Sequence, residues 1–130
     1  MQLPEWSKNT ANACLLTVTH FQELPCPYEP EQSTERPDFC IGTVDGNTTR
    51  HLRNMAIRTL QSDGNTVAMN YPYAGSMIPG KYFGDSRVQT IMVEINRSLY
   101  QKQGELLSIS NYRRIKNKIG ILLNNLSAAF

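Results

Sequence analysis

The sequence predicts an α/β fold in which a layered mixed sheet is flanked by helices. Short apolar segments rich in β-branched residues alternate with segments of helical periodicity, and long loops rich in proline and glycine lie between them. This alternation is typical of layered α/β sheets. A chain of 130 residues is long enough for one hydrophobic core and too short for two, so we expect a single domain over 1–130.

Four segments have the composition of buried strands. The first is followed by His20, and the fourth contains Glu94 among apolar residues. The stretch 22–37 holds four prolines, which lack an N–H and fix φ, so it is expected to be a long loop. The expected strands are 14–19, 39–44, 66–69 and 88–95.

The first expected helix lies between the second and third strands. Asn47 or Thr48 can accept an unpaired N–H of its first turn, and Gly64 can end it in the left-handed conformation. Its apolar residues recur at helical spacing: Leu52, Met55, Ala56 and Leu60.

The second expected helix begins near Ser108 or Ser110 and runs toward the end of the chain. We interpret its basic residues as a solvated face and its apolar residues as the core face. The apolar stripe is Tyr112, Ile115, Ile119, Leu122 and Leu126, and the basic residues are Arg113, Arg114, Lys116 and Lys118.

The composition argues against several classes of function. A net charge of +2 is too small to indicate a nucleic-acid or anionic-membrane partner, and no run of apolar residues is long enough to span a membrane. Residues 1–12 are polar and are expected to form a tail without a signal peptide, so we expect a cytoplasmic protein. The cysteines at 14, 26 and 40 lack paired spacing and are expected to be buried, reduced thiols.

Glu94 is the most informative single residue. A carboxylate within an apolar strand must be paired, bind a metal or titrate with a raised pKa, because burying it unpaired is costly. One interpretation is a structural ion pair with Arg97 or Arg87. The other is a general base or a partner of a metal-bound water.

Other polar residues follow the expected strands. Neutral imidazole is a common metal ligand, so His20 is a candidate zinc ligand, although a lone histidine is more often a hydrogen-bonded structural residue. Asn70 and Tyr73 lie in a loop where an amide and a phenol could bind a substrate carboxylate or an oxyanion, or simply form a packed turn. Because sites lie at the carboxyl ends of strands in such sheets, His20, Asn70 and Glu94 are expected to converge.

Three stretches together resemble the N-formylglutamate amidohydrolase family. They are RPDFCIGTVDGNTT, GNTVAMNYPYAGSMIPGKYFG and VQTIMVEINRSLYQ, which fall within residues 36–101. The resemblance implies a fold like that of the zinc carboxypeptidases and zinc-dependent hydrolysis of the amide of an N-formyl or N-acyl amino acid. It further implies that Glu94 is the catalytic base, that His20 is a zinc ligand, and that Asn70, Tyr73 and Arg97 contact the substrate.

Family members are about twice as long, and their N-terminal half supplies a histidine and a glutamate to the zinc site. Nothing before His20 is a histidine, and Glu5 is the only acid there. We therefore expect a sheet that is incomplete at its N-terminal side and weak zinc binding, if any. The alternatives are a non-catalytic remnant that binds a ligand or partner, and a zinc peptidase or amidase of other specificity. An incomplete sheet is expected to self-associate or to cover its edge with residues 1–12.

Overall fold

The computed structural model describes residues 13–129 and contains one four-stranded mixed sheet with two helices. The predicted α/β class is confirmed. The tail expected over 1–12 lies outside the described residues. In chain order the elements are β1 (Ala13–Phe21), β2 (Phe39–Gly42), α2 (Arg50–Gln61), β3 (Val67–Met69), η1 (Gly80–Tyr82), β4 (Val88–Asn96), η2 (Arg97–Leu99) and α3 (Ile109–Ala129).

The strands lie in the order β1-β4-β2-β3. β1 is parallel to β4, β2 is parallel to β3, and the two pairs meet through the antiparallel contact of β2 with β4. The carboxyl end of β3 therefore points the opposite way from the carboxyl ends of β1 and β4. This differs from the expected arrangement, in which polar residues would meet at one common edge of strand ends.

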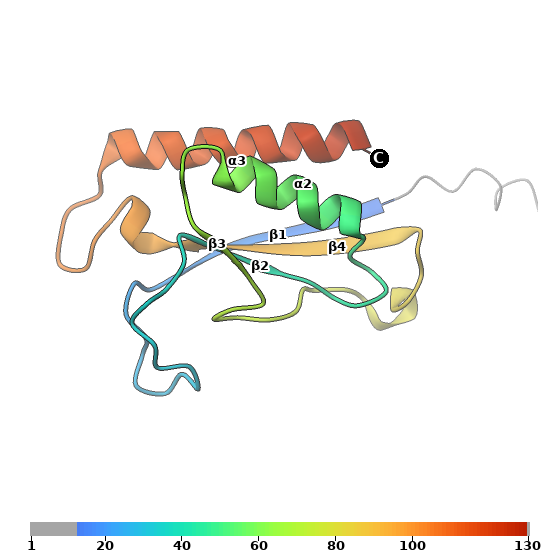
Figure 1. Cartoon of the computed structure of the whole chain (residues 1–130), viewed down its shortest axis with the longest axis horizontal. Coiled ribbons are helices and arrows are strands. Elements are labelled where there is room, and N and C mark those ends of the chain that lie inside the picture. The colour runs from blue at the N-terminus through green and yellow to red at the C-terminus, as the bar shows by residue number, and fades with distance from the viewer. Residues whose placement is uncertain (1–12, 130) are drawn as a thin grey trace, which may run out of the picture.

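The two faces of the sheet are covered differently. Helices α2 and α3 lie on one side, and the loops 22–38 and 70–87 lie on the other (Figure 1). We call these sides the helix face and the loop face. Because side chains alternate along a strand, Ile91, Val93 and Ile95 of β4 point to the helix face. The intervening Thr90, Met92, Glu94 and Asn96 point to the loop face.

The hydrophobic core fills the space between the sheet and the two helices. Residues of β2 and β4 meet apolar residues of both helices there, and all of them are at most 8% exposed. The core comprises Phe39, Ile41, Leu52, Ala56, Leu60, Ile91, Val93, Ile95, Ile115, Leu122 and Leu126. The helical spacings read from the sequence thus identify most of the buried residues of α2 and α3. Tyr112 was expected in the core stripe of α3 but is 47% exposed.

Two details of the helices differ from the expectation. Thr49, and not Asn47 or Thr48, caps α2, its Oγ1 accepting from the Leu52 N–H at 3.2 Å. Lys118 was expected on the solvated face of α3 but is buried, because its Nζ donates to the Leu60 carbonyl oxygen at 3.0 Å and to Asn65 Oδ1 at 2.7 Å. Lys118 Nζ also lies 3.1 Å from an Asp63 carboxylate oxygen.

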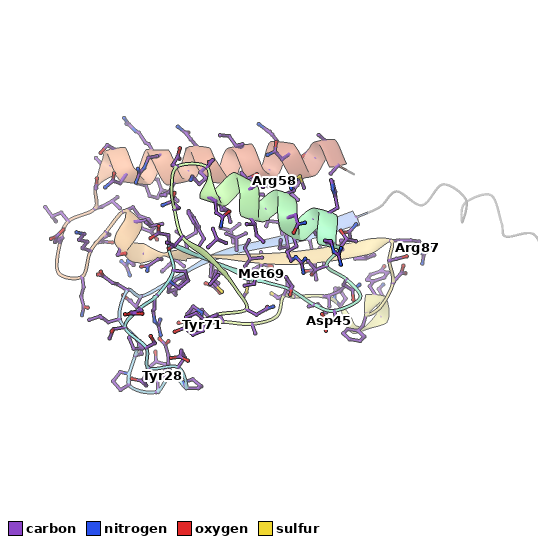
Figure 2. All side chains as sticks on the ribbon, viewed as in Figure 1. Tyr28, Asp45, Arg58, Met69, Tyr71 and Arg87 are labelled. Carbon is purple, nitrogen blue, oxygen red and sulfur yellow. The ribbon has the colours of Figure 1, made fainter. Side chains whose placement is uncertain are left out.

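Asn47 instead anchors the loop that precedes β4. Its side chain is 1% exposed, its Nδ2 lies within 3.2 Å of the carbonyl oxygens of Tyr82, Asp85 and Val88, and its Oδ1 accepts from Gly84 N–H at 2.8 Å. One amide group thereby satisfies several backbone groups of a segment some 40 residues away in the chain. The loop residues Asp45 and Arg87 lie near the end of the sheet at which β4 begins (Figure 2).

Candidate active site

Glu94 lies in the middle of the sheet, on the loop face. Its neighbours across the strands are Thr19 of β1 and Cys40 of β2. Glu94 is half-buried, and it takes part in none of the three ion pairs found among residues 13–129. The structural ion pair considered from the sequence is therefore not formed: Arg87 pairs with Asp85 at 2.7 Å, and Arg97 donates to Gln101 Oε1 at 2.9 Å.

The loop after β3 folds back along the loop face toward Glu94. Ser76 and Met77 contact Thr90 through hydrogen bonds of 2.7 and 2.6 Å, and the carbonyl oxygen of Tyr73 accepts from Cys40 Sγ at 3.1 Å. Because Cys40 lies opposite Glu94, this loop covers the same face as the candidate base. The structure thus brings the 70–75 loop to the Glu94 face by reversing the chain after β3.

Asn70 makes this reversal. Its φ is +52°, and a cis peptide bond joins Tyr71 to Pro72. Its Oδ1 accepts from the Thr43 N–H at 2.9 Å and the Gly75 N–H at 3.2 Å, and its Nδ2 donates to Thr43 Oγ1 at 2.8 Å. The amide that the sequence suggested for substrate binding therefore already serves to hold the loop. Tyr71, the next residue, lies on the side of the sheet away from the helices (Figure 2).

Tyr73 belongs to a buried polar cluster with Glu29 and Arg36. Its hydroxyl donates to Glu29 Oε2 at 2.9 Å and accepts from an Arg36 guanidinium nitrogen at 3.3 Å, and Arg36 pairs with Glu29 at 2.5 Å. The Arg36 side chain is only 1% exposed, and its guanidinium carbon lies 5.8 Å from the ring centroids of both Phe21 and Tyr73. The cluster ties the proline-rich loop 22–37 to the loop that covers Glu94.

The electrostatics of this cluster follow from its contacts. The Arg36 guanidinium, followed by the Cys26 N–H, lowers the pKa of Glu29 from 4.5 to about 2. Burial raises the pKa of Tyr73, so its phenol stays protonated and can donate. Burial also raises the pKa of Cys40, with a smaller contribution from the Glu94 carboxylate, and keeps the thiol neutral beside the candidate base.

The sequence did not single out Glu29, Arg36 or Cys40 as site residues. Glu29 and Tyr73 are 44 residues apart in the chain, and only the folded loop shows that they meet. Arg36 and Cys40 both lie in the stretch RPDFCIGTVDGNTT that carries the family resemblance, and this is the one signal that could have found Arg36. Cys40 was interpreted only as a buried thiol, which its zero exposure bears out. The other two cysteines are free but half-buried.

Arg97 begins η2, directly after β4, and lines a small polar pocket of about 180 Å³. Gln22 contributes to this pocket from the end of β1, and Lys102 adds a second cation. Gln101, which also lines the pocket, accepts hydrogen bonds from the Arg97 guanidinium through its Oε1. A pocket with two cations and several amides suits a carboxylate.

His20 lies near the end of β1 and is exposed. The register pairs it with Ile95 and pairs its neighbour Thr19 with Glu94. Because side chains alternate, His20 leaves the sheet toward the helix face while Glu94 points to the loop face. The structure does not bring these two candidate residues together, although they lie on adjacent strands.

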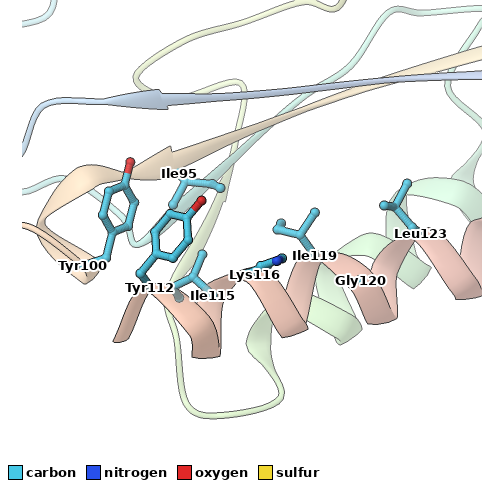
Figure 3. Close-up of a pocket in the computed structure, with 8 residues that line it drawn as sticks. All are labelled: Ile95, Tyr100, Tyr112, Ile115, Lys116, Ile119, Gly120 and Leu123. Carbon is cyan, nitrogen blue, oxygen red and sulfur yellow. The ribbon is translucent and has the colours of Figure 1, made fainter. Parts of the chain in front are cut away.

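The helix face carries a separate apolar pocket of about 350 Å³ (Figure 3). It is lined by Ile95 and by one side of α3, and the rings of Tyr100 and Tyr112 pack edge to face at 5.8 Å beside it. Its only charged lining residue is Lys116. Since Ile95 and Glu94 point to opposite faces, this pocket is not the cavity into which Glu94 would act.

No three histidine, cysteine, aspartate or glutamate residues within 13–129 gather in a group that could hold a metal ion. A catalytic zinc takes three protein ligands, so these residues do not form a zinc site by themselves. None of the helices in the same range is long and apolar enough to cross a membrane.

The mixed four-stranded sheet, with helices on one face and loops on the other, places the chain among layered α/β proteins. The model of the N-formylglutamate amidohydrolase family matches residues 3–101, so the chain belongs to that family. The resemblance read from the sequence motifs is thereby confirmed.

A solved structure supports the same fold. The crystal structure of N-formylglutamate amidohydrolase from Ralstonia eutropha JMP134 superposes with a TM-score of 0.70 at 22% sequence identity. The match covers 95% of this chain and 46% of that one, so the present chain spans about half the length of that protein. A search of curated proteins found no match.

Proposed function

We propose that this chain carries the general-base half of an amidohydrolase site and acts on the amide of an N-formyl or N-acyl amino acid, with N-formylglutamate as the reference substrate. The observation that carries the proposal is the position of Glu94. Within a chain of the N-formylglutamate amidohydrolase family, it is a half-buried strand carboxylate without an ion-pair partner among residues 13–129, beside a loop that folds over it.

The proposed chemistry assigns Glu94 the proton transfers. Its carboxylate takes a proton from a water molecule as the water oxygen adds to the acyl carbon. It then delivers that proton to the amine nitrogen as the C–N bond breaks, which gives the free amino acid and the carboxylic acid. Cys40 and the covering loop limit access of bulk water to the carboxylate.

The remaining residues are assigned by their contacts. Arg97, with Lys102 nearby, binds the substrate carboxylate in the polar pocket at the ends of β1 and β4. Asn70 and Tyr73 shape the loop over Glu94, since their polar atoms bind Thr43, Gly75, Glu29 and Arg36. Tyr73 and Asn70 thus contribute to substrate binding through the position of that loop.

Zinc is the cofactor that the family resemblance implies, with His20 as the ligand that this chain would supply. Because His20 and Glu94 point to opposite faces of the sheet, a zinc ion held by His20 would not lie beside Glu94, and no step of the proposed chemistry passes through it. The other ligands would have to come from outside residues 13–129. We therefore expect the isolated chain to bind zinc weakly or not at all. Elemental analysis after dialysis measures this, and a tight one-to-one stoichiometry would contradict it.

The central experiment compares hydrolysis and binding. Formate release from N-formylglutamate is measured for the chain with and without added zinc, and for Glu94→Gln and the exposed control Glu105→Gln. We expect activity to fall at least 100-fold in Glu94→Gln and to persist in the control. Equal activity in both variants would contradict the assignment of Glu94.

The two alternatives give different results in the same set of assays. A non-catalytic remnant binds N-formylglutamate in calorimetry without releasing formate, and the binding weakens in Arg97→Gln. A peptidase or amidase of other specificity cleaves a panel of peptides and acyl amino acids in preference to the formyl substrate. The half-length match and the separation of His20 from Glu94 favour testing the remnant first.

A further inference from the structure

Among the residues that the structure describes, the outer edge of β1 has no strand partner. β1 is the first strand in the order β1-β4-β2-β3, and no strand within 13–129 pairs with its other side. The Ala13 N–H donates to the Arg87 carbonyl oxygen at 2.9 Å, so the odd-numbered residues direct their backbone groups toward β4. Cys14, Leu16, Val18 and His20 therefore direct their N–H and C=O groups outward.

This edge lacks the features that protect sheet edges. Its nine residues include no lysine, no other formally charged residue, no proline and no glycine, and Leu15 and Val18 are 39% and 40% exposed. The opposite edge, β3, is only three residues long and therefore offers far less backbone for pairing. A long edge without charged residues or proline is the kind that pairs with another strand.

The edge is complementary to itself. In an antiparallel pair of two β1 strands centred on Thr17, Cys14 lies opposite His20 of the other copy and Leu16 lies opposite Val18, and each of these four residues directs its backbone groups outward. The two Thr17 residues then form the non-hydrogen-bonded pair on the two-fold axis. With no formally charged side chain on β1, this pairing brings no like charges together.

We propose that a second copy of this chain pairs antiparallel with β1, which joins the two sheets into one of eight strands. The exposed Val18 side chain is covered by Leu16 of the other copy on the helix face. On the loop face, Leu15 packs against Thr19 of the other copy beside a groove of about 570 Å³ lined by Leu15, Thr17 and the 76–79 segment. This inference does not depend on the proposed hydrolase activity.

The first test is the mass of the chain in solution, by sedimentation or light scattering over a wide concentration range. We expect a species of twice the 14.7 kDa chain mass. Thr17→Lys places two cations on the two-fold axis, and Val18→Pro removes an outward N–H without touching the bonds to β4. Each is expected to weaken association about tenfold or more, while Met69→Lys on the β3 edge leaves it unchanged.

The second test fixes the register. With Cys14 and Cys26 replaced by serine, Thr17→Cys is expected to form a disulfide-linked dimer on oxidation, because the two residue-17 side chains are directly opposed. Thr19→Cys, which faces Leu15, serves as the control. A monomer at all concentrations, a dimer unaffected by both edge variants, or equal cross-linking at 17 and 19 would each overturn the proposal. A monomer would leave this edge to a strand from another polypeptide segment.

Discussion

Gly42 of β2 and Gly75 of the covering loop are in backbone contact. A Cβ built on Gly42 would lie 1.9 Å from the Gly75 carbonyl oxygen and 2.6 Å from Met92 Cε. Only a residue without a side chain therefore lets the 70–75 loop lie flat on β2, one strand away from Glu94. The glycine that ends β2 thus has a direct role in shaping the candidate site.

Gly42→Ala is expected to destabilise the fold by about 1–3 kcal/mol, because the loop must move away from β2. Gly104→Ala is the control: it has φ +77° and open space around it, so it carries only the cost of left-handed backbone, about 1–2 kcal/mol. Urea unfolding measures both. Labelling of Cys40 by a thiol reagent in the native state is expected to accelerate only in Gly42→Ala, and unchanged labelling would mean that the loop does not move.

Much of the fold could be predicted because apolar periodicity is local information. The four strands and two helices lie within a few residues of their expected positions, and the buried residues of α2 follow the predicted spacing. The direction of β2 relative to β4 could not be read from the sequence, because the long loop 22–37 allows either orientation. The expectation that strand ends converge depended on that direction.

The site was predicted less completely, because its contacts join distant segments. Glu94 could be placed in a strand from its apolar neighbours. That it forms no ion pair with Arg87 or Arg97 could not be predicted, because these arginines bind Asp85 and Gln101 instead. The Glu29–Arg36–Tyr73 cluster depends on the fold of two loops. Lys118 was misplaced for the same reason, because its partners, Leu60 in α2 and Asn65 after it, lie more than 50 residues earlier in the chain.

Lys118→Ala is expected to destabilise the protein by about 2–4 kcal/mol. The substitution leaves the buried Leu60 carbonyl oxygen and Asn65 Oδ1 without their donor and opens a cavity where the lysine stem packs. Lys116→Ala on the exposed side of α3 is the matched control and is expected to change stability by less than about 0.5 kcal/mol. Denaturant midpoints compare the two, and equal effects would contradict the structural role of Lys118.

Asn47→Ala is expected to cost about 3 kcal/mol or more, because a fully buried amide with hydrogen bonds to Tyr82, Gly84, Asp85 and Val88 is lost. The helix itself should be little affected, since Thr49 is the cap. Thr49→Ala is therefore the informative comparison, and it is expected to lower the free energy of unfolding by about 1 kcal/mol through loss of the cap. Hydrogen exchange is expected to accelerate in the 80–88 segment only in Asn47→Ala; faster exchange confined to α2 would restore the capping interpretation.

The Glu29–Arg36–Tyr73 cluster, which joins the 22–37 loop to the 70–75 loop, is expected to weaken at low pH. The pKa of Glu29 is lowered from 4.5 to about 2, so its contribution to stability is fully present above about pH 4.5 and is lost as the pH falls toward 2. Glu29→Gln removes the charge at every pH. The wild type should therefore be more stable than Glu29→Gln near neutrality, and the difference should shrink through this window.

Urea unfolding of both proteins between pH 7 and pH 2 measures the difference directly. Glu23→Gln is the matched control: it lies in the same part of the chain, is exposed, and takes part in none of the ion pairs seen within 13–129. Its effect is expected to be small at every pH. A Glu29→Gln difference that stays constant down to pH 2 would mean that Glu29 and Arg36 act through packing alone, and that the 22–37 loop is held over Tyr73 without their charges.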